Sequence, residues 1–197
     1  MLPFRFLLVV LASLALGFPS AHAQQANTTL GQTDENPDPV FVFNRICYSQ
    51  VPSVKAISDM ALKLAWKSVD RTEVEQFRSY PDPTTLEGWD VQVGERLFRV
   101  GLTQAAPPPE MVEGLSGFDK GTATSCSIVL DDQQDAADFM PNMQTLAGKE
   151  PVSRDVPEGL LQTTTWAGGN DDIKVFLIAK APPTGKGGLL NVTILQK

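Results

Sequence analysis

Apolar and polar residues alternate along several short stretches of the chain, and this two-residue spacing is typical of β-strands. The clearest case covers residues 89–93 and 98–102, which lie on either side of a short polar segment. Gly94-Glu95 can form a two-residue turn with glycine first. In such a hairpin Trp89 faces Val100, so both strands present an apolar face in register.

Two other stretches have the three- and four-residue apolar spacing of helices. One begins near Ser53 and ends before Asp70, and because its apolar surface extends round the helix, we expect it to be covered on more than one side. The other is capped by Asp131 or Asp132, runs to about Leu146 and contains Pro141, which predicts a kink or an early stop. Further strands are predicted over residues 40–47, 122–130, 163–167, 173–180 and 189–195.

These elements predict an α+β fold, a mostly antiparallel sheet with two helices packed on one face. The hairpins exclude a purely parallel sheet, and two helices are too few to cover both faces of one. A sandwich or an open barrel is the alternative.

Residues 40–106 and residues 122–197 follow a similar order of elements, which suggests a tandem β-α-β-β duplication. Landmarks recur at offsets of 79, 77 and 75 positions, namely Cys47 and Cys126, Trp89 and Trp166, and the proline clusters that begin at Pro107 and Pro182. Under this hypothesis the two cysteines lie near the ends of equivalent strands, and a bond between them ties the halves together at a pseudo-twofold axis. The alternative is a chance match, since the halves share few identical residues.

The N-terminal segment, residues 1–23, has the pattern of a secretory signal peptide. Arg5 precedes an apolar stretch over residues 6–18, and Ala21-His22-Ala23 supplies a cleavage site near Ala23. This stretch is shorter than the roughly 20 residues that cross a bilayer, and no later stretch is long enough. We expect a periplasmic or secreted protein with a disordered, polar leader over residues 24–39 and a single domain over residues 40–197.

Cys47 and Cys126 are the only two cysteines of the chain. Export places them where thiols usually oxidise, so a disulfide between them is the main prediction. Two buried free thiols or one reactive thiol remain as alternatives. Neither cysteine belongs to a CxxC pair, which disfavours a role in thiol–disulfide redox catalysis.

The composition excludes several kinds of chemistry. The only histidine, His22, lies in the predicted signal peptide, so the mature chain lacks the residue required by Ser-His-Asp and Cys-His catalysis and by most zinc sites. The stretch over residues 185–188 lacks the spacing of a phosphate loop, and we expect neither a cofactor nor a metal. The net charge of −7, without a dense basic stretch, disfavours nucleic acid as a partner.

Carboxylates are the remaining candidates for chemistry. The cluster Asp131, Asp132, Asp135 and Asp138 fits the start of a helix better than a calcium or acid site. Glu87 lies close to Trp89, which could stack on a sugar, although a core tryptophan is the favoured interpretation. Residues 170–172 are more typical of a turn than of metal ligation.

Several landmarks follow one another along the chain: the predicted signal peptide, Cys47 followed by a predicted helix that opens near Pro52, Gly88-Trp89 on a predicted strand, and Ser125-Cys126 before Asp131. Over roughly residues 41–138 this arrangement resembles small exported bacterial proteins of unassigned function. The resemblance implies a periplasmic location and no activity.

We therefore expect a non-enzymatic binding or accessory module of the bacterial cell envelope. Its partner would be a protein, a peptide or a small amphipathic ligand. The alternatives are a carboxylate-dependent hydrolase that acts on envelope polysaccharide and a secreted enzyme inhibitor.

Overall fold

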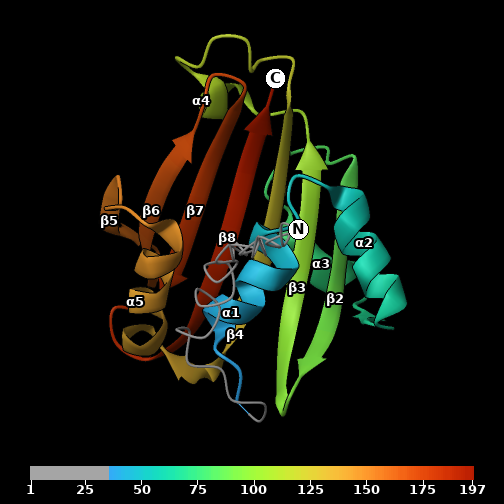
Figure 1. Ribbon diagram of the computed structural model, residues 1–197, viewed down its shortest axis with the longest axis vertical. Coiled ribbons are helices and arrows are strands. Elements are labelled where there is room, and N and C mark those ends of the chain that lie inside the picture. The colour runs from blue at the N-terminus through green and yellow to red at the C-terminus, as the bar shows by residue number, and fades with distance from the viewer. Residues whose placement is uncertain (1–35) are drawn as a thin grey trace, which may run out of the picture.

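The computed structural model describes residues 36–197, apart from the side chains of residues 131–136. The predicted signal peptide and residues 24–35 of the predicted leader lie outside the described residues. The described chain forms one eight-stranded sheet in the order β1-β2-β3-β4-β8-β7-β6-β5 (Figure 1). All its neighbouring strands are antiparallel, and the fold is broadly α+β, as the sequence predicts.

The strands are β1 (Lys67–Ser68), β2 (Thr85–Val93), β3 (Arg96–Ala105), β4 (Thr122–Asp135), β5 (Ser153–Glu158), β6 (Leu161–Gly169), β7 (Ile173–Ala181) and β8 (Lys186–Gln196). The α-helices are α1 (Pro39–Phe43), α2 (Val54–Lys63), α3 (Arg71–Val74), α4 (Pro109–Val112) and α5 (Ala136–Ala147). A π-helical turn, η1 (Asn44–Tyr48), continues α1, and a 3₁₀ turn, η2 (Glu75–Phe77), continues α3.

The strand predicted over residues 40–47 is wrong, because this segment forms α1 and η1. Asp38 accepts a hydrogen bond from the backbone N–H of Val40, and Pro39 occupies the first turn, as is common where helices begin. All five residues of α1 are buried. A helix that is buried on all sides needs no polar face. Its sequence is then a continuous series of apolar residues, which is also typical of a buried strand.

This finding also moves the start of the domain. Residues 37–39, assigned from the sequence to the disordered leader, are buried and belong to the folded part of the chain.

Helices lie on both faces of the sheet. The turns α1 and η1 and the two longest helices, α2 and α5, cover the face seen in Figure 1, where the main core forms. The opposite face of β2 and β3 carries Gly88 directly across from Gly101, and a Cβ atom on Gly101 would lie 2.0 Å from Cγ of Phe77 in η2. The prediction of two helices packed on one face is therefore not confirmed in full, because the described chain has further helices and two glycines make room for α3 and η2 on the other face.

That opposite face also carries a second, smaller apolar cluster and a row of buried polar groups. The cluster contains Tyr80, Ala105, Phe118, Ala123 and Leu195. The Tyr80 hydroxyl lies 2.5 Å from Ser125 Oγ, which in turn lies 2.6 Å from Thr193 Oγ1. Burial raises the pKa of Tyr80, so its hydroxyl stays protonated as a partner for Ser125.

The boundary between β4 and α5 also differs from the prediction. The strand continues to Asp135, and the helix begins at Ala136 rather than at Asp131 or Asp132. The pairing of β4 with β8 shifts register between Leu130 and Asp135. Helix α5 contains Pro141 and still runs to Ala147, so the early stop does not occur.

The first four strands form one half of the sheet and the last four the other half, with β4 and β8 adjacent at the centre. Each half contains one long helix and four strands, α2 with β1 to β4 and α5 with β5 to β8, but the first half also carries α3, η2 and α4 between its strands. The predicted β-α-β-β order is wrong for the first half, because residues 40–47 are helical. Trp89 and Trp166 lie on β2 and β6, and a duplication remains a hypothesis.

Candidate functional site

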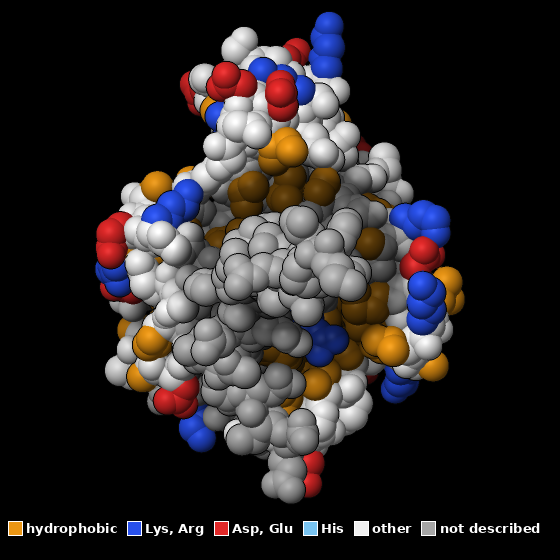
Figure 2. All heavy atoms as spheres, in the orientation of Figure 1, with side chains coloured by type: hydrophobic (Ala, Val, Ile, Leu, Met, Phe, Trp, Pro, Cys, Tyr) orange, Lys and Arg blue, Asp and Glu red, His pale blue; other side chains and the backbone are white. Residues whose placement is uncertain are grey.

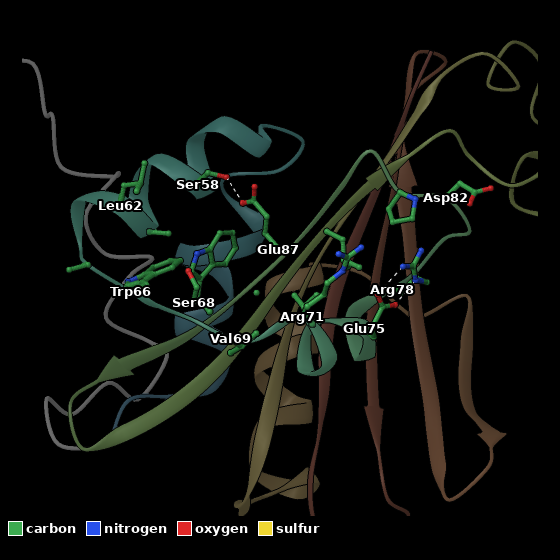
Figure 3. Close-up of a pocket in the computed structure, with 17 residues that line it drawn as sticks. Ser58, Leu62, Trp66, Ser68, Val69, Arg71, Glu75, Arg78, Asp82 and Glu87 are labelled. Atoms are coloured by element: carbon green, nitrogen blue, oxygen red, sulfur yellow. Dashed lines mark hydrogen bonds and ion pairs between the residues drawn. The ribbon is translucent and has the colours of Figure 1, made fainter.

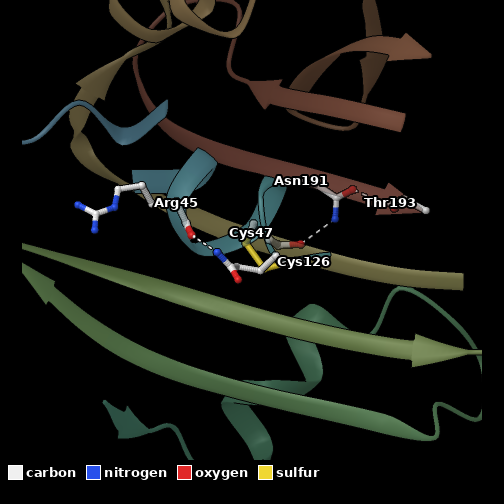
Figure 4. Close-up of a disulfide and its surroundings, with 7 residues drawn as sticks. Arg45, Cys47, Cys126, Asn191 and Thr193 are labelled. Atoms are coloured by element: carbon white, nitrogen blue, oxygen red, sulfur yellow. Dashed lines mark hydrogen bonds between the residues drawn. A yellow bond between two sulfur atoms is a disulfide. The ribbon is translucent and has the colours of Figure 1, made fainter. Parts of the chain in front are cut away.

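The structure joins Cys47 to Cys126 by a disulfide, with 5.3 Å between their Cα atoms (Figure 4). Cys47 lies on η1 and Cys126 on the central strand β4, so the two cysteines do not occupy equivalent strands as the duplication hypothesis expected. Both are fully buried, and the bond fastens the η1 turn to the middle of the sheet. A disulfide is compatible with an extracytoplasmic location.

Helix α2 lies over the β2 side of the sheet. The Ser53 hydroxyl accepts a hydrogen bond from the backbone N–H of Ala56 and caps the helix, and Ile57 and Ala61 are the residues that the helix buries. Leu62 and Leu64 are 80% and 63% exposed. The expectation that this helix is covered on more than one side is therefore wrong, because nothing in the described chain packs over its outer side chains.

Two grooves flank the segment that leads out of α2, and Ala65 and Trp66 line both of them. Ala65 has a positive φ of 52°, and the backbone N–H of Trp66 donates to the Ala61 carbonyl, which turns the chain back toward the sheet. The Trp66 ring meets Trp89 edge to face at a centroid distance of 6.0 Å. Figure 2 shows hydrophobic side chains at the surface on the side of the molecule that carries α2.

The first groove, which we call the polar groove, lies between α2, β2 and residues 68–83 and has a volume of about 950 Å³ (Figure 3). Within it the Ser58 hydroxyl donates to Glu87 Oε2 at 2.8 Å. Arg78 donates to both carboxylate oxygens of Glu75 at 2.6 and 2.9 Å. Arg71 and Asp82 add further charges of both signs.

The polar groove gives little support to a glycoside hydrolase. Such an enzyme needs one carboxylic acid whose pKa is raised enough to stay protonated. The hydrogen bond from Arg78 instead lowers the pKa of Glu75. Trp89 is only 6% exposed and belongs to the main core, in agreement with the favoured interpretation of this residue.

The second groove, which we call the apolar groove, lies between α1 and η1, the end of α2 and the strands β2 and β3, and has a volume of about 840 Å³. Its walls are mainly hydrophobic and include Phe41, Ile46, Met60, Leu64, Trp66, Val91, Val93 and Leu97. Arg45 and Lys67 also line it, and the Arg45 guanidinium carbon lies 5.6 Å from the centroid of the Phe41 ring.

The one acidic residue among those that line the apolar groove is Asp90, and a cation from another strand neutralises it. Arg99 Nε donates to Asp90 Oδ1 at 2.9 Å, and Arg99 also binds Glu73 of α3. Because neighbouring residues of a strand point to opposite faces, the Asp90 side chain points away from the face of Trp89 and Val91, toward α3.

The other sequence candidates do not assemble into a site. Asn170 Oδ1 accepts the backbone N–H groups of Asp172 and Ile173, which is the hydrogen bonding of a turn. Of residues 185–188, only Gly185 lies in the connection between β7 and β8, and residues 186–188 form the start of β8. The side chains of Asp131, Asp132 and Asp135 lie outside the described residues.

Two further findings concern the described part of the chain only. It contains no group of three or more His, Cys, Asp or Glu side chains that could hold a metal ion. None of its helices combines the length and the apolar character that crossing a bilayer requires.

Comparison of the chain with protein-family models, with curated proteins and with solved structures found no match. The candidate site therefore depends on the geometry alone. Sequence reasoning missed Arg45 and Leu64. The unusually continuous apolar surface of residues 54–66 was the available signal, but we interpreted it as core.

Proposed function

We propose that the protein is a non-enzymatic binding protein of the bacterial cell envelope, which takes the apolar part of a small amphipathic ligand into the apolar groove. The observation that carries the proposal is this groove, which has mainly hydrophobic walls and lies beside a helix that leaves leucines exposed. Its volume of about 840 Å³ falls in the range of small-molecule sites. The location follows from the predicted signal peptide and agrees with the disulfide.

The energetics of such a site depend on apolar burial. Each methylene group removed from water contributes about 0.8 kcal/mol, so ten buried methylenes supply roughly 8 kcal/mol before the costs of ordering the ligand. We therefore expect dissociation constants in the micromolar range or weaker for single-chain ligands.

The proposal is tested by titrating the protein, expressed from its full coding sequence, with the neutral apolar probe N-phenyl-1-naphthylamine. Leu64→Asp places a charge at the groove and is expected to weaken binding at least about tenfold, since it removes apolar contact and desolvates a carboxylate. Leu160→Asp is the matched control, because Leu160 is 91% exposed on the turn between β5 and β6 and lines neither groove.

Three results would overturn this function. The first is an absence of probe binding by the unaltered protein, and the second is an equal loss of binding in both variants. The third is release of reducing sugars from cell-wall glycan by the purified protein, which would return the assignment to a hydrolase.

A further inference from the structure

The outer edge of β2 is only partly covered by the chain. β1 pairs with residues 89–90 of this strand, and the Val69 N–H extends the pairing by donating to the Gly88 carbonyl at 3.1 Å. Ala65, with its positive φ of 52°, turns the preceding chain away from β2. Within the described chain, nothing pairs with residues 91–93 on this side of the strand.

The main-chain groups of Gln92 point toward this uncovered edge. The Gly88 carbonyl binds Val69 at the outer edge, and in an antiparallel strand the N–H and C=O groups of every second residue point the same way. Asp90, which pairs with β1, and Gln92 therefore also direct their main-chain groups outward. An added strand would exchange two hydrogen bonds with Gln92.

The apolar groove runs along the same edge. Four consecutive residues of β2, 90–93, line it, whereas β3 contributes Leu97 alone. A groove over one face of the sheet would be lined by every second residue of β2 and by their neighbours on β3, because side chains alternate between the faces. An extended segment in the groove would therefore lie beside the Gln92 main chain, with Leu64 and Trp66 close to it.

The other edge of the sheet, β5, has features that prevent strand addition. Pro157 lacks a main-chain N–H, Asp155 has a positive φ of 51°, and the pairing with β6 is irregular. Residues 91–93 contain neither a proline nor a charge, and their pairing with β3 is regular. Because proteins protect edges that must not pair, this difference favours β2 as the edge that accepts a strand.

The charges of the groove favour a ligand with an acidic group. Arg45 lines the groove, is exposed, and forms no ion pair with any carboxylate whose side chain is described. Asp90, the one acidic residue that lines the groove, is neutralised by Arg99. An acidic group on the ligand is complementary to Arg45, although the chain as a whole has a net charge of −7.

From these observations we infer that the ligand is a short extended peptide that adds an antiparallel strand to β2 opposite residues 91–93. Its alternate apolar side chains lie in the apolar groove beside Val91 and Val93, and an acidic residue pairs with Arg45. The peptide continues the pairing that β1 makes with β2. This inference rests on the proposed function and names the chemical class of the ligand.

A second copy of the chain fits this edge less well than a short peptide. Twofold pairing of two β2 strands about Gln92 would bring residues 94–96 of one copy opposite residues 88–90 of the other. That position is already occupied by β1 and Val69. The free part of the edge therefore suits a segment of only a few residues.

Calorimetric titration with the peptide acetyl-Glu-Thr-Leu-Thr-Leu-amide tests the inference. Antiparallel addition places its fourth residue opposite Gln92 and its two leucines beside Val91 and Val93. N-methylation of the fourth residue removes the donor to the Gln92 carbonyl and should weaken binding about fivefold, the contribution of one hydrogen bond. N-methylation of either leucine, whose N–H points away from β2, should have a smaller effect. Equal losses at adjacent positions would overturn the inference.

Two variants of Gln92 test the same hydrogen bonds from the side of the protein. Gln92→Pro removes the outward N–H, and edge strands tolerate proline at such positions. Gln92→Ala removes the same side chain but keeps the N–H, so it should bind the peptide about fivefold more tightly than Gln92→Pro. Equal affinities would contradict strand addition. Circular dichroism checks that both variants fold, and the N-methylated peptides decide the inference on the unaltered protein if Gln92→Pro does not.

A second peptide, with glutamine in place of the glutamate, tests the role of Arg45. The unaltered protein should bind the glutamate peptide about twofold to fivefold more tightly, as expected of one exposed ion pair, and Arg45→Gln should abolish this preference. Lys63→Gln is the matched control, because it removes the same charge but Lys63 lines neither groove. Loss of the preference in both variants would reduce it to overall charge and overturn the assignment of Arg45.

The remaining outcomes separate the two proposals. Binding of N-phenyl-1-naphthylamine without binding of either peptide leaves the proposed function standing and overturns the peptide assignment. Failure of the probe and of both peptides to bind overturns both proposals. Light scattering that shows a dimer dissociated by Gln92→Pro would also overturn the inference, because a second copy of the chain would then occupy the edge.

Discussion

The two halves of the sheet carry similar elements but are closed to different extents. In the half formed by β5 to β8, α5 packs Phe139 and Met143 against the strands with no exposed surface, and Trp166 is 1% exposed. The Trp166 indole N–H donates a hydrogen bond of 3.0 Å to Gln144 Oε1, which links α5 to β6.

In the half formed by β1 to β4, α2 meets the core through one large side chain, Ile57, and one small one, Ala61. The Trp66 ring, in the segment that follows the helix, meets Trp89 edge to face. Helix α5 fully buries Phe139 and Met143 against the strands beneath it. Helix α2 is instead followed by a segment with a groove on either side. The open half is therefore where we place the ligand.

The largest expected effect is that of truncating the tryptophan of the closed half. Trp166→Ala should lower the free energy of unfolding by about 3 to 5 kcal/mol, because it leaves a cavity in a well-packed core. Trp66→Ala, in the partly exposed segment, should cost much less, roughly 1 kcal/mol. Urea unfolding followed by circular dichroism measures both, and equal losses would contradict the difference between the halves.

The disulfide fastens a wall of the open half to the centre of the sheet. Its loss should cost about 4 kcal/mol in the chain-entropy model, since the bond closes a loop over a sequence separation of 79 residues. The measurement is the urea midpoint with and without reductant. The variant Cys47→Ala with Cys126→Ala is the control and should not respond to reductant, and an unchanged midpoint in the unaltered protein would show that the bond contributes nothing.

A comparison of two glycines tests how closely η2 packs on β3, on the face of the sheet opposite α2. Gly101→Ala in the open half should cost about 1 to 3 kcal/mol, because the new Cβ would lie 2.0 Å from Cγ of Phe77 and the ring would have to move. Gly168→Ala in the closed half should cost less, because its Cβ would meet only the flexible end of Lys149. Thermal unfolding ranks the two variants, and the reverse order would refute the packing described for η2.

The smallest effect concerns Asp38, which caps α1 and accepts a hydrogen bond from Asn142 of α5. Burial raises the pKa of Asp38 above 3.8, against the opposing effects of its hydrogen bonds and of Arg96. The folded protein therefore binds this proton more tightly than the unfolded chain, and the contribution of Asp38 to stability falls as the pH rises from about 3.8 through the raised pKa.

Asp38→Asn keeps a good capping residue and removes this titration. The stability of the variant relative to the unaltered protein should rise through that pH window and stay constant above it, by a total of roughly 1 kcal/mol or less. Chemical unfolding at a series of pH values measures the difference, and a relative stability that falls with pH would contradict the sign.

The hairpin of β2 and β3 could be predicted in detail, including the pairing of Trp89 with Val100, because one face is buried and the turn is short. Residues 40–47 could not, because a segment buried on all sides carries no periodicity. The end of β4 was missed as well, since acidic residues such as Asp131 resemble helix caps but here continue a strand.

The candidate site was harder to predict than the fold. Its grooves lie beside a helix that buries only Ile57 and Ala61 and leaves Leu62 exposed, and this depends on tertiary packing rather than on local pattern. The disulfide partners, by contrast, followed from a cysteine count and an expected compartment.

Hydrogen–deuterium exchange with and without N-phenyl-1-naphthylamine tests the central claim most directly. The account predicts slower exchange on ligand binding in η1, in residues 60–67 and in residues 91–97, with no change in α5 or β6. Protection confined to the closed half, or no protection anywhere in the presence of saturating ligand, would contradict it.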